Sequence, residues 1–314
     1  LGGGGPDDDH DEYDESVIAH EWVSFVQLTQ SRDNNFGGPH SGEEILFSSA
    51  YSEGVVTAIG NGLLDQQTYL DTKGYPDGGV STISFGFDLE SGTLPGAGSG
   101  YGNEFEVSRA VWDFIDGGTG GPADGDADPT AISMQNFLSS FADLKNRAGS
   151  YEVVWLASLI QELVDDSHVN TTDANTVMTA HSAAFPPAGG PSSFAPEIIA
   201  GGGTLNGSLD AHSGTDPNVI LGPQANAVFK FIISTAVTVT INLANTTAGY
   251  AADANQLDLT IHAMDRQILG AHEGNAQNKQ IIVTLQPGVY QIRVQHMPAN
   301  QGISATSSFD LAVS

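Results

Sequence analysis

The chain is 314 residues long, enough for two domains with a sizeable core, and it contains no cysteine, which excludes disulfide bonds and thiol chemistry. Nine basic residues face 38 acidic ones, and the net charge of −29 argues against nucleic acid or an anionic membrane as a partner. No run of 18 apolar residues occurs, so we expect no membrane span. Because Leu1 opens the chain without a signal-peptide pattern, we expect a processed or trimmed product.

The charge is unevenly distributed along the chain. Residues 205–314 hold only seven of the acidic residues and four of the basic ones. This asymmetry predicts two separate units. We interpret the acidity as a soluble surface suited to salty or extracellular water, with cation binding by some of the carboxylates as the alternative.

Residues 1–15 form a low-complexity tail in which glycines precede a run of acidic side chains. Such a tail cannot bury enough apolar surface to offset its ordering entropy. We expect it to be ordered only where the rest of the fold, an ion or a neighbouring chain covers it. Coverage by a neighbouring subunit is the sharper hypothesis, because a head-to-tail contact that does not close makes a filament.

The first helix is predicted to begin near Asp14 or Ser16, where acidic residues suit a helix N-terminus. Apolar residues at helical spacing predict its buried face. They are Val17, Ile18, Trp22, Phe25 and Val26.

This helix carries two residues of a zinc-peptidase motif. In H-E-x-x-H, the two histidines stand one turn apart and bind zinc, while the glutamate acts as the general base. His20 and Glu21 keep the first two positions, but the residue at i+4 is Ser24, and a neutral hydroxyl is a poor zinc ligand. The alternative for His20 is a histidine held by hydrogen bonds in a polar core.

Further helices are predicted downstream, and one of them is apolar almost all round, which indicates a central position. Their ranges are 43–64, 104–116, 131–145, the apolar 151–164 and the weaker 172–183. A strand-like run lies at 81–87.

An acidic loop separates two of these helices. Asp124, Asp126 and Asp128 alternate like part of a calcium loop, so calcium is a possible ligand. The distal glutamate of an EF-hand is missing, and an ordinary acidic turn is the alternative.

After residue 204 the apolar period changes from 3.6 to 2 residues. Alternating runs predict strands at 227–233, 237–243, 257–261, 280–285, 289–295 and 307–313. Short strands at this density are typical of a β-sandwich. The sequence therefore predicts a multi-domain α+β chain, with a mainly helical domain at 1–183, a Pro/Gly linker at 184–204 and an all-β sandwich at 205–314.

Residues 10–165 resemble the helical half of secreted gluzincin metallopeptidases of the fungalysin-like kind. The motifs that carry the resemblance occur in the family's order: His20-Glu21-Trp22, then Gly37-Gly38-Pro39-His40-Ser41, then Ser52-Glu53-Gly54, and then 103–113. The resemblance implies that His20 and Glu53 are zinc ligands and that Glu21 is the general base.

Residues 205–314 resemble the bacterial pre-peptidase C-terminal domain, a secreted β-sandwich that accompanies such peptidases. The runs at 257–261 and 285–294 carry this likeness. The two resemblances together imply an extracellular protein.

Several residues depart from the peptidase pattern. Besides Ser24, Val23 replaces a glycine, Val55 replaces an aromatic residue, and the upstream lobe that walls the substrate cleft is missing from this sequence. His40 and His10 are the local candidates for a replacement ligand. We expect the zinc positions to be vestigial and no cofactor to be bound.

Three functions remain open. The first is an inactive, secreted, peptidase-like protein with a structural role that assembles with itself, as a homo-oligomer or filament. The second is a secreted zinc endopeptidase with an altered ligand set, in which Glu21 activates a zinc-bound water. The third is a surface- or carbohydrate-binding module centred on the sandwich.

Overall fold

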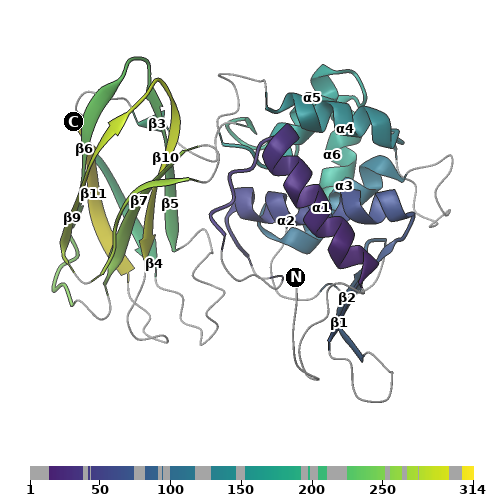
Figure 1. Cartoon of the computed structure of the whole chain (residues 1–314), viewed down its shortest axis with the longest axis horizontal. Helices are drawn as coiled ribbons and strands as arrows, with labels where there is room; N and C mark the ends of the chain where they lie inside the picture. The colour runs from purple at the N-terminus through teal and green to yellow at the C-terminus, as the bar shows by residue number, and fades with distance from the viewer. Residues whose placement is uncertain are drawn as a thin grey trace.

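The fold is mixed α+β, with a helical part and a β-sandwich that lie side by side in the computed structural model (Figure 1). The structure describes residues 14–37, 42, 44–73, 82–90, 94, 100–116, 129–145, 153–191, 197–198, 204–210, 225–251, 255–263, 267–274, 276–296 and 306–314. The predicted N-terminal tail up to residue 13, including His10, lies outside these residues, as do His40 and the Asp124–Asp128 loop.

Helices form at or near every range that the sequence predicts. They are α1 (Glu15–Gln30), α2 (Phe47–Leu64), α3 (Glu104–Ile115), α4 (Met134–Asp143), α5 (Leu156–Asp165) and α6 (Thr171–Ala180). Polar caps fix three of the starts: the side chains of Asn103, Ser133 and Asn170 accept hydrogen bonds from backbone N–H groups in the first turns of α3, α4 and α6. In the described part of the chain, no helix is long and apolar enough to cross a bilayer.

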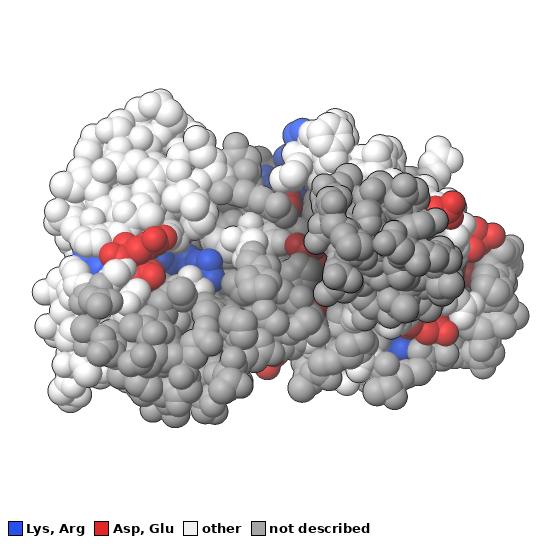
Figure 2. All heavy atoms as spheres, turned by 60° about the horizontal axis from the view of Figure 1, so that its bottom comes forward, with Lys and Arg blue, Asp and Glu red and all other residues white. Residues whose placement is uncertain are grey.

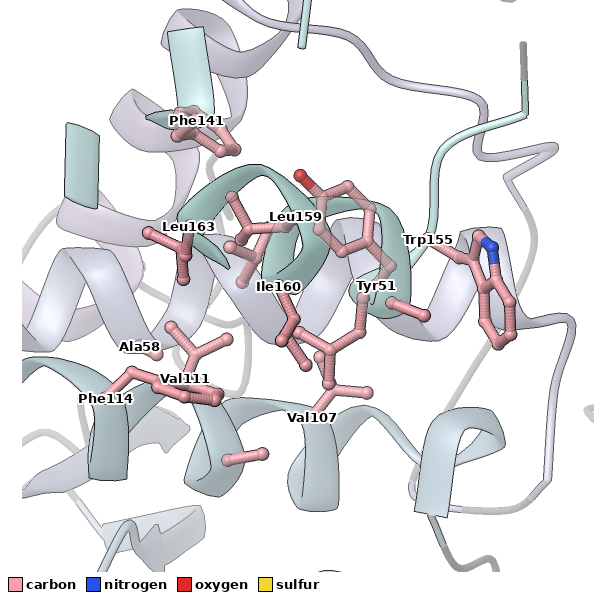
Figure 3. Packing of buried hydrophobic residues seen from close by; sticks show 14 of the residues in the cluster. Tyr51, Ala58, Val107, Val111, Phe114, Phe141, Trp155, Leu159, Ile160 and Leu163 are labelled. Carbon is pink, nitrogen blue, oxygen red and sulfur yellow. The ribbon is translucent and has the colours of Figure 1, made fainter. Parts of the chain in front are cut away.

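The predicted central helix is α5. Leu159, Ile160 and Leu163 are fully buried, and Figure 3 shows them in one cluster with Tyr51 of α2 and Val111 of α3. A helix that is apolar on most sides must be enclosed by other elements, so here the sequence pattern and the packing agree.

The orientation of α1 differs from the sequence prediction. Val17 is buried as expected, but Ile18, Trp22 and Phe25 point away from the core. The buried side of the helix carries Val23 and the polar Gln27, whose Oε1 accepts a hydrogen bond from Ser52 on α2. The inner surface of α1 is thus held partly by polar contacts, and its most apolar surface faces outward on the outside of the helical part (Figure 1).

A β-hairpin extends from the helical part. The strand-like run predicted at 81–87 is β2 (Thr82–Asp88), and it pairs antiparallel with β1 (Thr68–Lys73), which the sequence analysis missed. The carboxylate of Asp14 accepts hydrogen bonds from the backbone N–H (2.6 Å) and the hydroxyl (2.7 Å) of Thr72. This contact fixes the hairpin to the start of α1.

The sandwich consists of two sheets. The strand order of the five-stranded sheet is β3-β5-β10-β7-β8, and that of the four-stranded sheet is β4-β11-β6-β9. The strands are β3 (Glu197–Ile198), β4 (Thr204–Asp210), β5 (Asn226–Ile233), β6 (Val237–Asn245), β7 (Leu257–Ala263), β8 (Ile268–His272), β9 (Asn278–Leu285), β10 (Gly288–His296) and β11 (Thr306–Val313). Alternate residues such as Val239, Ile241 and Leu243 point into one apolar core between the sheets. All six predicted strands are present, whereas β3, β4 and β8 were not predicted.

The helical part and the sandwich touch through a mixed contact. The guanidinium of Arg293 on β10 lies 4.9 Å from the ring centre of Phe36, and His262 on β7 packs edge-on against the same ring. Leu46, Val153 and Val228 form a small apolar cluster there. On the face drawn in Figure 2, blue and red side chains lie next to each other over the sandwich on the left.

Candidate functional site

A pocket of about 240 Å³ lies where α1, α2, α3 and the β1–β2 hairpin meet. It contains the first and the third of the expected zinc positions. Its lining residues are His20, Glu53, Thr57, Tyr69, Asp71, Phe85, Phe87, Glu104, Phe105 and Ser108.

Two glycines of α2 bring the three helices close enough to form this pocket. A Cβ atom at Gly54 would lie 2.5 Å from the carbonyl oxygen of Glu104 on α3. A Cβ atom at Gly60 would lie 3.1 Å from the backbone of Ala19 and His20 on α1. Only glycine allows both approaches, so the sequence of α2 sets the distance between His20 and Glu53.

Both ring nitrogens of His20 have a polar neighbour on α2. Its Nδ1 lies 2.9 Å from the hydroxyl of Thr57, and that hydroxyl also lies 2.9 Å from the carbonyl oxygen of Glu53. Its Nε2 lies 3.4 Å from Oε2 of Glu53, so a protonated ring forms an ion pair with this carboxylate.

Surrounding polar groups hold the carboxylates of Glu53 and Glu104 in place. Oε1 of Glu53 accepts a hydrogen bond of 2.6 Å from the amide of Asn35, in the loop after α1. Oε1 of Glu104 accepts one of 2.9 Å from the backbone N–H of Gly42. These bonds orient the carboxylates before any ligand arrives.

Ser24 does not replace the missing histidine in the structure. Its hydroxyl donates to the carbonyl oxygen of His20 at 3.1 Å, one turn back along α1. The neighbouring Val23 is buried in the helical core, as is Val55 after Glu53-Gly54. The residues that depart from the peptidase pattern thus satisfy the local backbone or fill the core.

Glu21 lies away from the pocket. Its side chain is exposed, and it is not among the residues that line the cavity. Of the three residues that the resemblance assigns to catalysis and zinc binding, the structure brings together His20 and Glu53 and leaves Glu21 outside.

The pair fits part of a zinc site. Two ligands of a tetrahedral zinc, each about 2.0–2.2 Å from the metal, lie about 3.3–3.6 Å apart, and the His20–Glu53 separation of 3.4 Å falls in that range. Among the described residues, no third side chain lies close enough to this pair to share one ion with it. The acidic side chains that do lie close enough to one another to share an ion are those of Asp143, Glu162 and Asp166, in another part of the fold. The described residues therefore offer a spacing that suits two of the three protein ligands of a catalytic zinc site.

Aromatic side chains from the hairpin and α3 also line the pocket. The ring centres of Phe87 and Phe105 are 4.6 Å apart, those of Phe85 and Phe105 are 5.3 Å apart, and those of Tyr69 and Phe87 are 5.7 Å apart. Tyr69 also lies edge-on to the His20 ring, with 6.3 Å between the ring centres. The pocket lining thus combines carboxylates with a group of aromatic rings in mutual contact.

Sequence reasoning missed most of the residues that line the pocket. Thr57 could have been found, because it lies one turn after Glu53 on the same face of a predicted helix. Tyr69 and Asp71 lie on β1, which was not predicted, and no local pattern indicates that Phe105 on α3 reaches the hairpin.

A second histidine–carboxylate group lies outside the pocket. Nδ1 of His181, just after α6, is 3.0 Å from a carboxylate oxygen of Glu106, and its Nε2 is 2.8 Å from one of Asp113, both on α3. Burial by itself lowers the pKa of His181, but the hydrogen bonds and charges of Asp113 and Glu106 outweigh burial and raise the pKa from 6.5 to about 9. At neutral pH this histidine is therefore protonated, and its two contacts link the end of α6 to α3.

No protein-family model matches the chain, and no curated protein sequence matches it. Solved structures resemble part of it. The pre-peptidase C-terminal domain of a collagenase from Bacillus anthracis is 16% identical with a TM-score of 0.28, and the match covers 38% of this chain and 94% of that one. A periplasmic inhibitor of g-type lysozyme from Aeromonas hydrophila is 16% identical with a TM-score of 0.25, over 38% and 94% of the two chains. A carbohydrate-binding module in complex with calcium and xylotriose is 14% identical with a TM-score of 0.18, over 36% and 88%.

Proposed function

We propose that this protein is an extracellular, catalytically inactive, peptidase-like protein with a structural role, and that it associates with itself through the outward face of α1. The contacts of Ser24 and the position of Glu21 support inactivity, because a working site needs a third ligand and a base that reaches the metal-bound water. The outward face of α1 carries the proposal of self-association.

That face carries several large apolar side chains. Four large side chains on α1 are well exposed: Ile18 at 43%, Trp22 at 57%, Phe25 at 63% and Leu28 at 46%. Isolated exposed apolar residues are normal on a protein surface, but a group of this size on one short helix is typical of a contact surface. Aromatic residues such as Trp22 are also the side chains that most often dominate binding energy.

A second copy of the chain suits this face for a reason of charge. The chain has a net charge of −29, so most contacts between copies would bring like charges together. Helix α1 contains no lysine or arginine, and its only acidic residues are Glu15 and Glu21, in its N-terminal half. Antiparallel packing of two α1 helices, each about 24 Å long, places the two Glu15 residues at opposite ends of the contact and joins the apolar centres.

Such a contact is the same patch on both copies, so it closes as a two-fold dimer. A filament requires a further contact. The edge strands of the sandwich offer one, because Ile268 on β8 and Ile282 on β9 are exposed at 60% and 64%. Added salt should favour either contact by screening the acidic surface.

Sedimentation velocity of the purified chain from 1 to 100 micromolar tests the proposal. We expect a concentration-dependent dimer, and Trp22→Ser should raise the dimer dissociation constant at least about tenfold, as loss of a central aromatic contact does. Val237→Ser is the matched control, because it removes an apolar side chain that is 42% exposed from β6, a strand inside its sheet and away from both proposed contacts. A monodisperse monomer at every concentration would disprove self-association through this face. The same result is expected if another protein, or a further part of a longer chain, covers α1.

The zinc-endopeptidase alternative is favoured by one observation, the 3.4 Å separation of His20 Nε2 and Glu53 Oε2. It predicts about one zinc per chain by elemental analysis and casein hydrolysis that a chelator blocks. Our proposal predicts neither, and it also predicts that Ser24→His alone does not restore activity, because Glu21 still points away from the pocket.

A further inference from the structure

We infer that the β-sandwich positions the pocket beside His20, and that the short segment 34–36 after α1 is the connection between them. Three consecutive residues of this segment contact three different parts of the molecule: Asn34 the core of the helical part, Asn35 the pocket and Phe36 the sandwich. The inference concerns the interior of the molecule, and it does not depend on self-association through α1. It gives the sandwich a role in the geometry of the helical part.

Phe36 lies on the outer face of the five-stranded sheet, away from the core between the two sheets. The guanidinium of Arg293 on β10 is 4.9 Å from the centre of its ring, and the ring of His262 on β7 lies edge-on with 4.8 Å between the ring centres. Phe36 also packs against the apolar cluster that contains Val228, the residue paired with Arg293 on the neighbouring strand β5. Three strands of the sandwich thus hold one side chain of the helical part.

The contact between Phe36 and Arg293 is a strong one for its type. Arg293 is buried, and its Nε–H donates a hydrogen bond of 2.7 Å to the side-chain oxygen of Asn226 on β5. Burial lowers the pKa of Arg293 to about 10, an effect that the charge of Asp258 opposes, so the guanidinium is a cation at neutral pH. A buried cation over an aromatic ring interacts more strongly than an exposed one, because little water competes with the ring.

Side-chain hydrogen bonds make the segment between Phe36 and the pocket rigid. The carboxylate of Asp33 accepts a hydrogen bond of 2.8 Å from the backbone N–H of Asn35, and the side-chain oxygen of Asn35 accepts one of 2.9 Å from the N–H of Gly37. Turns closed by Asp and Asn side chains replace the backbone hydrogen bonds that an irregular segment lacks. A displacement of Phe36 therefore moves its neighbour Asn35 as well.

The carboxylate of Glu53 is the pocket end of the connection. The amide of Asn35 donates a hydrogen bond of 2.6 Å to its Oε1, while its Oε2 lies 3.4 Å from Nε2 of His20. The position of Asn35 therefore helps to set the orientation of the carboxylate relative to the His20 ring. A glutamate side chain has many accessible rotamers when it is not held, so the loss of this contact gives the carboxylate other orientations.

Nuclear magnetic resonance of the full chain with ring-labelled histidine tests the inference, with the His20 signals as the probe. The spectrum of His20→Gln assigns those signals. Asn35→Ala removes the connection at its pocket end, and Phe36→Leu removes the aromatic ring while it keeps an apolar side chain. Arg293→Gln removes the contact from the sandwich side. We expect the largest shift of the His20 signals in Asn35→Ala, and smaller shifts along the same line in the other two variants, because all three release the same carboxylate.

Two controls separate this connection from general effects. Lys230→Gln removes a positive charge from the outer face of the same sheet, on the neighbouring strand β5, and it should leave the His20 signals in place. In the double variant that combines Asn35→Ala and Arg293→Gln, the signals should stay where Asn35→Ala alone places them, because the connection is already broken. Circular dichroism checks that each variant is folded.

Three results would overturn the inference. The first is unchanged His20 signals in folded Phe36→Leu and Arg293→Gln variants, which would make the contact a simple attachment of the two parts; if one of the two does not fold, the other decides. The second is a shift in Lys230→Gln as large as that in Arg293→Gln, which would reduce the effect to net charge. The third is a further shift in the double variant, which would show that the effect reaches His20 without Asn35.

Discussion

Two histidine–carboxylate groups in the helical part have the same chemical components and opposite environments. His181 contacts a carboxylate with each ring nitrogen, at 3.0 and 2.8 Å, and it does not line the pocket beside His20. His20 contacts a hydroxyl and one carboxylate, and it borders a pocket with an aromatic wall. The first group has its hydrogen bonds completed within the fold, and the second has a face directed at a ligand-sized space.

The comparison shows how burial and partners separate a structural ion pair from a binding site. A charged group that is buried and fully hydrogen-bonded stabilises the fold, because removal of one partner leaves the others uncompensated. A group that keeps an open side contributes less to stability and remains available to a ligand. His181 and His20 should therefore respond differently to substitution.

The largest effect is expected at His181. His181→Ala leaves Glu106 and the buried Asp113 side by side without a cation, and we expect the free energy of unfolding to fall by about 3 kcal/mol or more. Urea unfolding followed by circular dichroism measures it. His168→Ala, at a half-buried histidine of the same helical part, is the control, and equal losses in the two variants would contradict the structural role of His181.

The pH dependence of stability should carry the signature of the same group. The folded pKa of His181 is raised from 6.5 to about 9, so its contribution is fully present below pH 6.5 and is lost as the pH rises to about 9. At 1.36 kcal/mol for each pKa unit, the loss amounts to about 3 kcal/mol. Urea midpoints between pH 6 and 10 should show this fall in the unaltered protein, and a fall of the same size in His181→Gln would assign it to other groups.

The smallest effect on stability is expected at His20. His20→Gln loses a contact with Glu53 that is partly exposed to solvent, and glutamine can still reach Thr57, so we expect a loss below about 1 kcal/mol. A loss of stability as large as that of His181→Ala would show that the two groups have the same structural role.

The sequence determined the elements whose signal is local. The strict alternation at 237–243 produces β6 because side chains of a strand point to opposite faces, and one face must be buried against the second sheet. The apolar residues of α5 likewise require enclosure whichever helices surround them. The His20 and Glu53 positions were also found from the sequence, through the order of the motifs around them.

Only the tertiary structure decided which face of α1 is buried, and what surrounds His20. Helical periodicity groups Ile18, Trp22 and Phe25 on one face, but it does not say whether another element of the chain covers that face. The close approach of α1 to α2 at Gly60 and the hydrogen bonds of His20 and Gln27 turn the polar face inward. The pocket wall depends on contacts between residues far apart in the sequence, such as Phe87 with Phe105, and such contacts leave no periodic pattern in the chain.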